Sequence, residues 1–409
     1  MKPLLQVSAD DVPALVERLR DAVLHDGPAV LPVPVGADGA EPVETSVPDA
    51  VAVVVETSGS TDAPKRVALS ASALVASADA TSDRLGEPGQ WLLALPAHYI
   101  AGVQVLVRGL VAGTRTVVLG DAATHGAATH GGARDDAARP GGFDPYAFAE
   151  ASARLDPHVP HFTSLVPVQL ARIVEAARRD PFVAAAITAY DAVLVGGQAL
   201  APEIADAAAG LGVRVVRTYG SSETAGGCVY DGLPLDGVDV RIVDGLVELA
   251  GPVLAEGYLD DPGRTAAAFA LDRGRRWYRT GDLGALDAGG RLRIRGRADD
   301  VIISGGVKVA LGEVERAVRA MPGMSEAVVV RVADAEWGER AAVVVAGASG
   351  SLDELAAATD AAGLPPAGRP VRLVVLDVLP RLASGKPDRR ALAALPEISG
   401  HDGPDRANP

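Results

Sequence analysis

A loop of small hydroxyl residues, residues 57–65 (TSGSTDAPK), is the first segment of this chain whose residue types suit chemistry. It directly follows residues 50–56 (AVAVVVE), an apolar run that predicts a buried strand. Glycine and hydroxyl side chains let backbone N–H groups approach phosphate oxygens closely, and Lys65 can neutralise phosphate charge. The Walker A spacing is absent, and a flexible linker is the alternative interpretation of the segment taken alone.

A second segment, residues 219–224 (YGSSET), follows an expected strand at residues 213–218. Open α/β sheets bind ligands at the carboxyl ends of their strands. Tyr219 can pack on a purine ring, and Glu223 can give oxygen ligands to Mg²⁺, which prefers them together with phosphate. The alternative is a turn with a solvated glutamate.

Three later segments also suit the chemistry of a nucleotide. Residues 278–284 (YRTGDLG) place Asp282 after a glycine, where its carboxylate can accept both hydroxyls of a ribose; an ordinary turn is the alternative. Residues 379–389 (LPRLASGKPDR) carry Lys386 on a Ser-Gly loop, either as a mobile cation or as a surface lysine. Residues 295–306 (RGRADDVIISGG) combine charge with glycine, which suits a hinge between domains.

In this order and at these separations, the five segments resemble the adenylate-forming superfamily of acyl-CoA ligases, peptide-synthetase adenylation domains and beetle luciferases. The resemblance covers residues 56–389, most of the chain. It implies an enzyme that uses ATP and Mg²⁺ to make an acyl-adenylate and then transfers the acyl group to CoA. One departure is Asp62, since the family usually has glycine there; we expect its carboxylate to point away from the phosphates, because two anions repel.

The resemblance also implies a role for individual residues. It predicts ATP binding by Thr57, Ser58, Gly59, Ser60, Thr61, Lys65, Gly196, Gly197, Gln198, Tyr219, Gly220, Ser221, Asp282 and Arg297. It predicts catalytic roles for Lys386, Glu223 and Thr224. Glu223 would be the Mg²⁺ ligand, Thr224 would hold a phosphate oxygen, and Lys386 would offset the charge that grows in the first half-reaction. Asp299 would be the hinge that withdraws Lys386 before CoA attacks, and Gly305, Gly306 and Lys308 are the expected CoA contacts.

The acid is suggested by the short N-terminal part and by two segments, residues 95–108 (LPAHYIAGVQVLVR) and 164–170 (SLVPVQL). Both are similar to the o-succinylbenzoate–CoA ligases of menaquinone biosynthesis. Such a substrate keeps one free carboxylate, for which Arg108 is a candidate partner; an ion pair of Arg108 at the surface is the alternative. His98, Tyr99 and Ser164 are expected to line the acyl pocket, and the choice between His98 and Tyr99 stays open.

Other functions remain open at this stage. They are a CoA ligase for another aryl or short-chain acid, a stand-alone adenylation enzyme, a light-emitting oxidoreductase, and an inactive nucleotide-binding member.

The elements that must position these residues alternate between β-branched runs and Ala-rich helical patterns, which predicts an α/β fold. Helices are expected at residues 72–85, 101–112, 169–179, 202–210, 312–320 and 352–362. Strands are expected at residues 50–56, 67–69, 91–95, 116–119, 161–166, 192–195, 213–218, 327–332, 341–346 and 371–376. Asp244-Gly245 predicts a hairpin turn between strands at 238–243 and 246–249.

This pattern predicts a large N-terminal domain of sheets with flanking helices and a β-rich subdomain, residues 1–298, in which residues 121–142 are a flexible insertion. A small mobile α+β lid follows at residues 299–396, and residues 397–409 are expected to be a disordered tail.

Composition narrows the class of protein. The 409 residues carry a net charge of −15, which disfavours nucleic acid as a partner. A single cysteine excludes an intramolecular disulfide. No apolar run reaches the ~18 residues of a membrane span, and the N-terminus lacks the pattern of a signal peptide. We therefore expect a cytoplasmic enzyme acting on small molecules; a homodimer is one option, and the oligomeric state stays open.

Overall fold

The computed structural model describes residues 1–34, 46–57, 65–120, 143–347, 350–382 and 386–399. The chain divides into two compact units. Unit 1 comprises Met1–Leu200, Ile204–Val240 and Leu249–Arg279, and unit 2 comprises Ala201–Glu203, Arg241–Glu248 and Thr280–Pro409. The predicted insertion at 121–142 lies outside the described residues, as do Ser58, Gly59, Ser60, Thr61 and Asp62.

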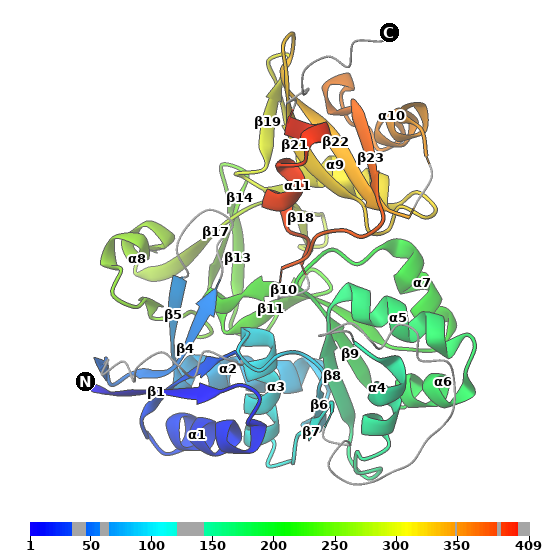
Figure 1. The fold of residues 1–409 in the computed structure, drawn as a ribbon. Helices are drawn as coiled ribbons and strands as arrows, with labels where there is room; N and C mark the ends of the chain where they lie inside the picture. Colours follow the sequence, from blue (N-terminus) through cyan, green and yellow to red (C-terminus); the bar gives the residue numbers. More distant parts are fainter. Residues whose placement is uncertain (35–45, 58–64, 121–142, 348–349, 383–385, 400–409) are drawn as a thin grey trace. The chain divides into compact units, whose positions relative to one another are not determined.

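The first sheet of unit 1 has six strands in the order β15-β5-β4-β2-β1-β3 (Figure 1). Their bounds are β1 Lys2–Ser8, β2 Ala29–Val33, β3 Ser46–Val47, β4 Val51–Thr57, β5 Lys65–Ser70 and β15 Gly257–Tyr258. All five valine and alanine positions of Val51–Val55 are buried, as expected for a central strand that reads as one apolar run. Strands β4 and β5 are antiparallel neighbours in this sheet.

The second sheet of unit 1 has seven strands in the order β12-β11-β10-β9-β8-β6-β7. Their bounds are β6 Gln90–Leu93, β7 Val117–Val118, β8 His161–Leu165, β9 Ala192–Val195, β10 Val215–Ser221, β11 Gly226–Tyr230 and β12 Leu233–Pro234. Strands β7, β6, β8, β9 and β10 are parallel, so their carboxyl ends share one edge of the sheet. That edge is where the predicted nucleotide residues must gather.

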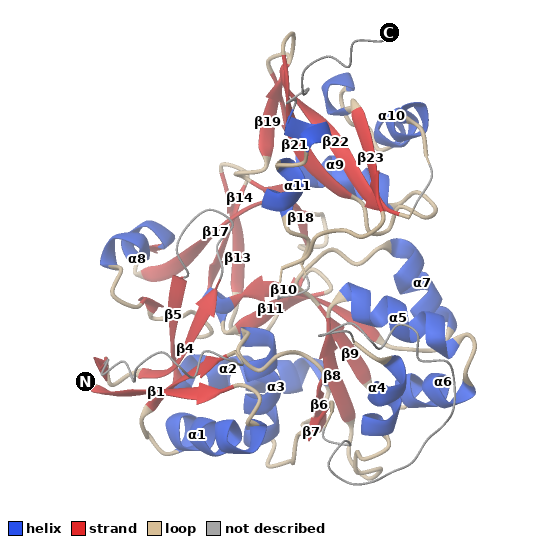
Figure 2. Ribbon diagram, viewed as in Figure 1, coloured by secondary structure: helices blue, strands red, loops and turns tan. Residues whose placement is uncertain are grey.

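Helices cover both faces of this second sheet (Figure 2). The helices of unit 1 are α1 Val12–Leu24, α2 Ala71–Leu85, α3 Ile100–Val111, α4 Pro145–Ser152, α5 Pro167–Ala177, α6 Pro181–Thr188 and α8 Pro262–Ala268; α7, Pro202–Gly210, begins in residues assigned to unit 2. Helices α4, α5 and α6 pack together over a hydrophobic core that includes Phe148, Leu170 and Val193. Helices α1, α2 and α3 contact one another and both sheets, so they lie between the two sheets.

A third sheet has the order β13-β14-β17-β16, with β18 paired to β17. The bounds are β13 Asp239–Val243, β14 Leu246–Ala250, β16 Phe269–Asp272, β17 Arg275–Leu286 and β18 Leu292–Arg297. The predicted hairpin is confirmed: Asp244 and Gly245 both have positive φ, at 50° and 82°, as a tight two-residue turn requires. The long strand β17 runs through the point, between Arg279 and Thr280, where the two units divide.

The remaining sheet of unit 2 has the order β20-β19-β22-β21, with β23 parallel to β22. Its elements are β19 Val301–Ser304, β20 Val307–Ala310, α9 Leu311–Arg319, β21 Val328–Asp334, β22 Gly338–Ala346, α10 Leu352–Ala361, β23 Arg372–Leu376, α11 Arg389–Ala393 and α12 Pro396–Ser399. Val329 and Val343 pack with residues of α9 and α10 on one face, and Val328 and Val344 with residues of α11 and α12 on the other. Both faces are therefore buried, which explains why β21 and β22 read as continuous apolar runs.

The α/β fold is confirmed, and the structure adds several corrections. Helix α12 contains Ile398, which is only 2% exposed, so the predicted disordered tail does not begin at residue 397. The expected helix at 169–179 is confirmed as α5, and a further helix that was not predicted, α6, starts at Pro181 with Asp180 as its cap. The elements β1, α1 and β2 were not predicted. No helix in the described part of the chain is long and apolar enough to cross a membrane.

Candidate active site

The carboxyl edge of the second sheet holds the residues predicted to lie beside adenine. Gly196 follows β9, next to β10, and a Cβ at this position would lie 2.3 Å from Thr218 Oγ1. Only glycine therefore lets the two strand ends approach so closely. Tyr219, on β10, is half-buried at the same edge, and Gln198 follows in the loop after β9. The structure thus brings Gly196, Gln198 and Tyr219 to one edge, although they are some 20 residues apart in sequence.

The sequence predicts that the YGSSET segment follows a strand, but in the structure the segment begins within that strand. Tyr219, Gly220 and Ser221 belong to β10, with a bulge between the first two, and Ser222–Thr224 form a short 3₁₀ turn. A Cβ on Gly220 would lie 2.1 Å from the carbonyl oxygen of Gly226 on β11. The bulge and this close approach place Glu223 in a buried turn instead of on the surface.

Thr224 is fully buried, and its hydroxyl is occupied within this turn. Its Oγ1 accepts a hydrogen bond from the Ser221 N–H at 2.9 Å and donates toward the Gly226 carbonyl at 2.7 Å. A hydroxyl group has only one proton, so Thr224 cannot donate a hydrogen bond to a phosphate oxygen while it donates to Gly226. The predicted contact of Thr224 with phosphate therefore stays a prediction, and the structure shows a residue that holds the turn together.

Glu223 is 8% exposed, and its carboxylate has a specific partner. Its Oε1 accepts a hydrogen bond from the Tyr258 hydroxyl at 2.8 Å, and its backbone carbonyl accepts one from the Ala255 N–H at 2.9 Å. Burial first, and then the Glu223 charge, raise the pKa of Tyr258. Mg²⁺ in nucleotide sites takes one or two carboxylates and completes its shell with water and phosphate, so a single oriented carboxylate fits this ion.

Thr57 and Lys65 lie opposite each other at the ends of β4 and β5. Glu56 and Arg66, the next pair in register, form an ion pair at 2.9 Å that links the two strands. The Lys65 Nζ lies 6.0 Å from the centre of the Tyr258 ring. Of the predicted phosphate loop, the structure therefore describes the two ends, which are held on adjacent strands.

The residues expected around the acyl group lie at the start of α3 and at the end of β8. The His98 and Tyr99 rings are 4.1 Å apart, and both residues are half-buried. Burial lowers the pKa of His98, an effect that Asp10 partly offsets, and burial raises the pKa of Tyr99. Ser164 is 8% exposed near the carboxyl end of β8. The choice between His98 and Tyr99 stays open.

Arg108 is buried on α3, with 5% of its surface exposed, so the alternative of a surface ion pair is wrong. Its Nη2 donates to the Tyr230 hydroxyl at 3.3 Å, and its guanidinium stacks 4.9 Å from the Trp91 ring. Its Nε is buried without a hydrogen-bond partner among the described atoms. Desolvation lowers the pKa of Arg108, and Tyr230 acts in the opposite direction.

The hydroxyl of Tyr230 donates one hydrogen bond and accepts another, and its neighbours determine which. Thr81 donates its hydroxyl proton to the Ser77 carbonyl at 2.8 Å, so its oxygen accepts from the Tyr230 hydroxyl 3.0 Å away. The Tyr230 oxygen is then left to accept from Arg108. This series of hydrogen bonds ends at the Arg108 guanidinium, which has no carboxylate partner among the described residues.

In unit 2, Asp282 and Arg297 lie opposite each other on β17 and β18. Arg297 Nη1 is 3.2 Å from Asp282 Oδ1, and its Nε is 3.1 Å from Asp299 Oδ1. Desolvation opposes the charge of Arg297, but Asp299 and Asp282 together raise its pKa. Asp282 lies within a strand, where Gly281 has a φ of 73°, and not in the turn considered as its alternative.

Lys386 lies in the same unit, where residues 386–387 pair with residues 381–382. The Leu382 N–H donates to the Lys386 carbonyl at 2.8 Å, and Arg381 pairs with Pro387. Surrounding protein atoms lower the pKa of Lys386 by desolvation, while Asp282 raises it and Arg297 lowers it. Asp282, the residue predicted to hold the ribose, is therefore one of the charges that act on Lys386.

Gly305 and Gly306 form the turn between β19 and β20, with φ of 56° and 80°. This hairpin geometry explains both glycines, and Lys308 is exposed on β20 just beyond it. Their contact with CoA stays a prediction.

Two residues of the site were not predicted from the sequence. Tyr258 and Tyr230 lie outside all five segments, and each acts on a predicted residue through a contact between distant parts of the chain. The only signal in the sequence is the scarcity of aromatics, 4% of all residues, which makes each tyrosine informative.

Two family models match the chain: "AMP-binding enzyme" over residues 4–133 and "AMP-binding enzyme C-terminal domain" over residues 313–386. The fold and these matches define an adenylate-forming enzyme, and the chain belongs to the AMP-binding enzyme family. The predicted family is thus confirmed.

Within that family the chain is similar to a probable 2-succinylbenzoate–CoA ligase from Mycobacterium tuberculosis (strain ATCC 25618 / H37Rv). The two are 42% identical over 402 residues, which cover 95% of this chain and 97% of the relative. It is also similar to the structure of o-succinylbenzoate CoA synthetase (MenE) from Bacillus subtilis in complex with the acyl-adenylate intermediate OSB-AMP, with a TM-score of 0.71, 26% identity, and coverage of 97% of this chain and 79% of that one. The same Bacillus enzyme in complex with ATP and a magnesium ion gives a TM-score of 0.65 at 26% identity, over 89% of this chain and 75% of that one.

Proposed function

We propose that this protein is an ATP-dependent acid–CoA ligase that converts o-succinylbenzoate to its acyl-adenylate and then to o-succinylbenzoyl-CoA. AMP and pyrophosphate are released, and the product serves menaquinone biosynthesis. The similarity to the Mycobacterium relative over nearly the whole of both chains supports this substrate. With ATP and CoA as co-substrates, the proposed location is the cytoplasm.

The observation that carries the choice of acid is the buried guanidinium of Arg108. A cation away from water is costly unless it is paired, and the described residues give Arg108 a hydroxyl and an aromatic face but no carboxylate. The substrate has two carboxylates, of which only one is activated. The other can supply the missing charge, because an arginine fork suits a carboxylate.

In the first half-reaction the acid carboxylate attacks the α-phosphate, which brings two anions together. Mg²⁺, when bound through Glu223, would neutralise part of the phosphate charge. Lys386 would offset the charge that grows at the reacting phosphorus, and Lys65 would hold the outer phosphates. Asp282, oriented by Arg297, would accept the ribose hydroxyls.

The second half-reaction needs a different set of groups, because CoA attacks the acyl carbon and no phosphate charge develops. We propose that the chain turns at Asp299, which withdraws Lys386 and lets the CoA thiol approach. Gly305, Gly306 and Lys308 are the proposed CoA contacts.

The test measures CoA-thioester formation from o-succinylbenzoate, ATP and CoA, against a panel of benzoates and short fatty acids. We expect o-succinylbenzoate to exceed the other acids by orders of magnitude in kcat/KM. We expect Lys386→Ala to lower the rate of adenylation by ~10²–10³, the usual cost of one group that stabilises transition-state charge.

Arg108→Gln is the control for the choice of acid. It should reduce turnover of o-succinylbenzoate and leave that of simple benzoates nearly unchanged. If another acid is preferred by the wild-type enzyme, the ligase mechanism survives but the assignment of the substrate is wrong. If no acid releases pyrophosphate, the protein is a nucleotide-binding member of the family without ligase activity.

A further inference from the structure

Tyr258 connects two residues that the proposed function assigns to ATP and its metal. Its hydroxyl donates to Glu223 Oε1 at 2.8 Å, and its ring lies 6.0 Å from the Lys65 Nζ. The three residues come from β15, the 3₁₀ turn after β10, and the start of β5, all within unit 1. Tyr258 is 9% exposed, so this arrangement is largely shielded from water.

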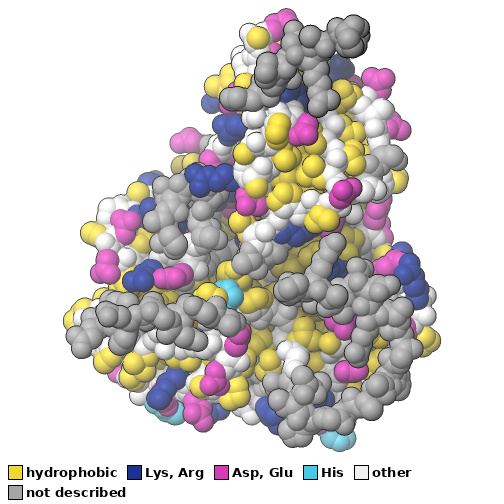
Figure 3. Space-filling model, in the orientation of Figure 1, with side chains coloured by type: hydrophobic (Ala, Val, Ile, Leu, Met, Phe, Trp, Pro, Cys, Tyr) yellow, Lys and Arg dark blue, Asp and Glu magenta, His cyan; other side chains and the backbone are white. Residues whose placement is uncertain are grey.

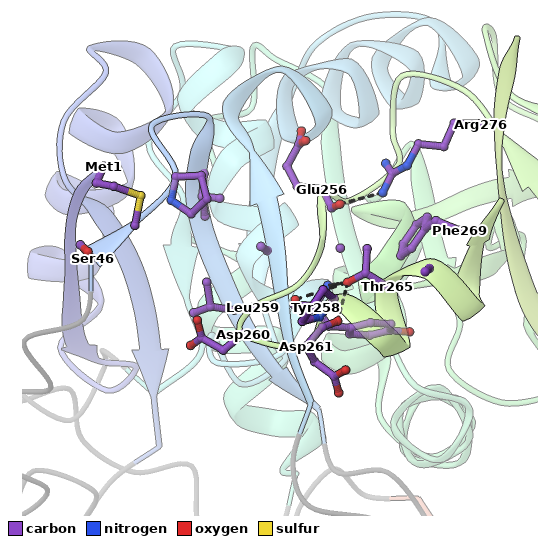
Figure 4. A pocket seen from close by; sticks show the side chains of 16 residues that line it. Met1, Ser46, Glu256, Tyr258, Leu259, Asp260, Asp261, Thr265, Phe269 and Arg276 are labelled. Carbon is purple, nitrogen blue, oxygen red and sulfur yellow. Dashed lines mark hydrogen bonds between the residues drawn. The ribbon is translucent and has the colours of Figure 1, made fainter. Parts of the chain in front are cut away.

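The position of the Tyr258 ring is fixed by its surroundings. Strand β15 pairs with β5, where Tyr258 lies opposite Val67, and the Tyr258 N–H donates to Thr265 Oγ1 at 2.9 Å. Phe269 packs beside the ring, with the two ring centres 6.1 Å apart. Figure 4 shows Tyr258, Thr265 and Phe269 together on the wall of a groove of about 690 Å³. Because the Tyr258 ring is held in place, its hydroxyl can fix the orientation of the flexible Glu223 carboxylate.

Glu223 needs such a partner because a glutamate side chain has three rotatable bonds. A hydrogen bond to one carboxylate oxygen limits rotation of the group and leaves the other oxygen able to accept a cation. Ligating carboxylates are commonly hydrogen-bonded in this way, and loss of the outer partner typically costs ~10–100-fold in metal affinity or activity. The π face of the ring also attracts cations: the Lys65 Nζ lies 6.0 Å and the Arg264 guanidinium carbon 5.9 Å from its centre.

We propose that Tyr258 is a positioning residue that orients the Glu223 carboxylate for the metal of the metal–ATP complex and steadies Lys65 beside the phosphates. This inference rests on the proposed function, since it assigns Glu223 to Mg²⁺. In this role Tyr258 would act through Glu223 and would not itself contact the metal or the reacting atoms.

The experiment compares nucleotide binding to wild type and Tyr258→Phe, in excess EDTA and in excess Mg²⁺, by calorimetry with ATP in the absence of acid and CoA. We expect the gain in ATP affinity that Mg²⁺ provides to fall about 10-fold in the variant, within the range for an outer-shell partner. Affinity in EDTA should change much less. Tyr190→Phe, which removes another buried hydroxyl bonded at 2.8 Å to Ser152, is the matched control and should behave as wild type.

A second measurement separates orientation from simple loss of packing. In the background of Glu223→Gln, adding Tyr258→Phe should have no further effect on the metal-dependent gain, because a residue that acts through Glu223 has nothing left to orient. Additive effects, or equal losses of affinity with and without Mg²⁺, would overturn the inference. A wild-type protein whose ATP affinity does not respond to Mg²⁺ would instead overturn the proposed function.

Discussion

His98 shows how a single buried group sets a pH response. It is half-buried beside Tyr99, and burial lowers its pKa below the ordinary 6.5 even though Asp10 opposes the shift. The imidazole is therefore neutral at pH 7. Because the unfolded chain binds this proton more readily than the folded chain, the neutral His98 contributes stability above pH 6.5 that is lost as the pH falls toward its folded pKa.

We expect His98→Asn to lose less stability than wild type between pH 7.5 and 5.5, because the variant lacks the imidazole whose pKa burial lowers in the folded state. Urea unfolding at the two pH values measures the difference. The exposed His158 offers a control, since His158→Asn should lose as much as wild type. An equal loss in all three proteins would show that His98 does not respond in the predicted way.

At the scale of elements, ion pairs hold the residues that follow Lys386, at the start of α11, against α9. Glu315 on α9 is 7% exposed and pairs with Arg319 at 2.9 Å and with Arg389 at 2.6 Å, and it accepts the Val329 N–H at 3.0 Å. Asp388 caps α11 directly after the loop. A second pair, Arg381 with Glu326 at 2.8 Å, is partly exposed. The loop is thus held at both ends, but by pairs of very different burial.

Glu315→Gln should lower the free energy of unfolding by about 3–5 kcal/mol, because it leaves the buried Arg319 cation without its charge partner and weakens the pair with the partly exposed Arg389. Glu326→Gln removes the partly exposed pair and should cost only about 0–1 kcal/mol. Urea unfolding at pH 7 measures both. Similar, small effects of the two changes would show that the Glu315 cluster is not a buried charge network.

At the scale of the whole molecule, the predicted site residues are divided between the two units. Glu223, Lys65 and Tyr258 belong to unit 1, and Asp282 and Lys386 belong to unit 2. The division falls between Arg279 and Thr280, and the predicted hinge at Asp299 remains a prediction. On the face drawn in Figure 3, basic side chains are scattered among acidic ones over both units and form no continuous basic patch.

We expect Asp299→Pro to affect the two half-reactions unequally, because proline restricts the backbone about which the chain is proposed to turn. Pyrophosphate exchange reports adenylation, and thioester formation from pre-formed acyl-adenylate reports the second step. One rate should stay within about twofold of wild type while the other falls at least 10-fold. Equal effects on both rates would contradict a hinge at this residue.

The sequence by itself determined the family, the chemistry and most of the elements. Short motifs such as residues 57–65 and 219–224 predict their ligands because phosphate and metal ions each favour particular donors and acceptors. Apolar runs such as residues 192–195 and turn pairs such as Asp244-Gly245 are local signals, and the structure confirms both. Helix α12 was missed because its four residues are ordered by burial of Ile398, which local propensity does not report.

Only the tertiary structure decided which residues contact and orient the predicted site residues. Tyr258 reaches Glu223 across 35 positions, and Tyr230 reaches Arg108 across 122, so no spacing in the sequence reveals either contact. Burial is decided in the same way: Arg108 could have been a surface residue until packing against Trp91 and Tyr230 removed it from water. Motifs record what a ligand requires, whereas the partners that orient those motifs depend on how distant segments pack.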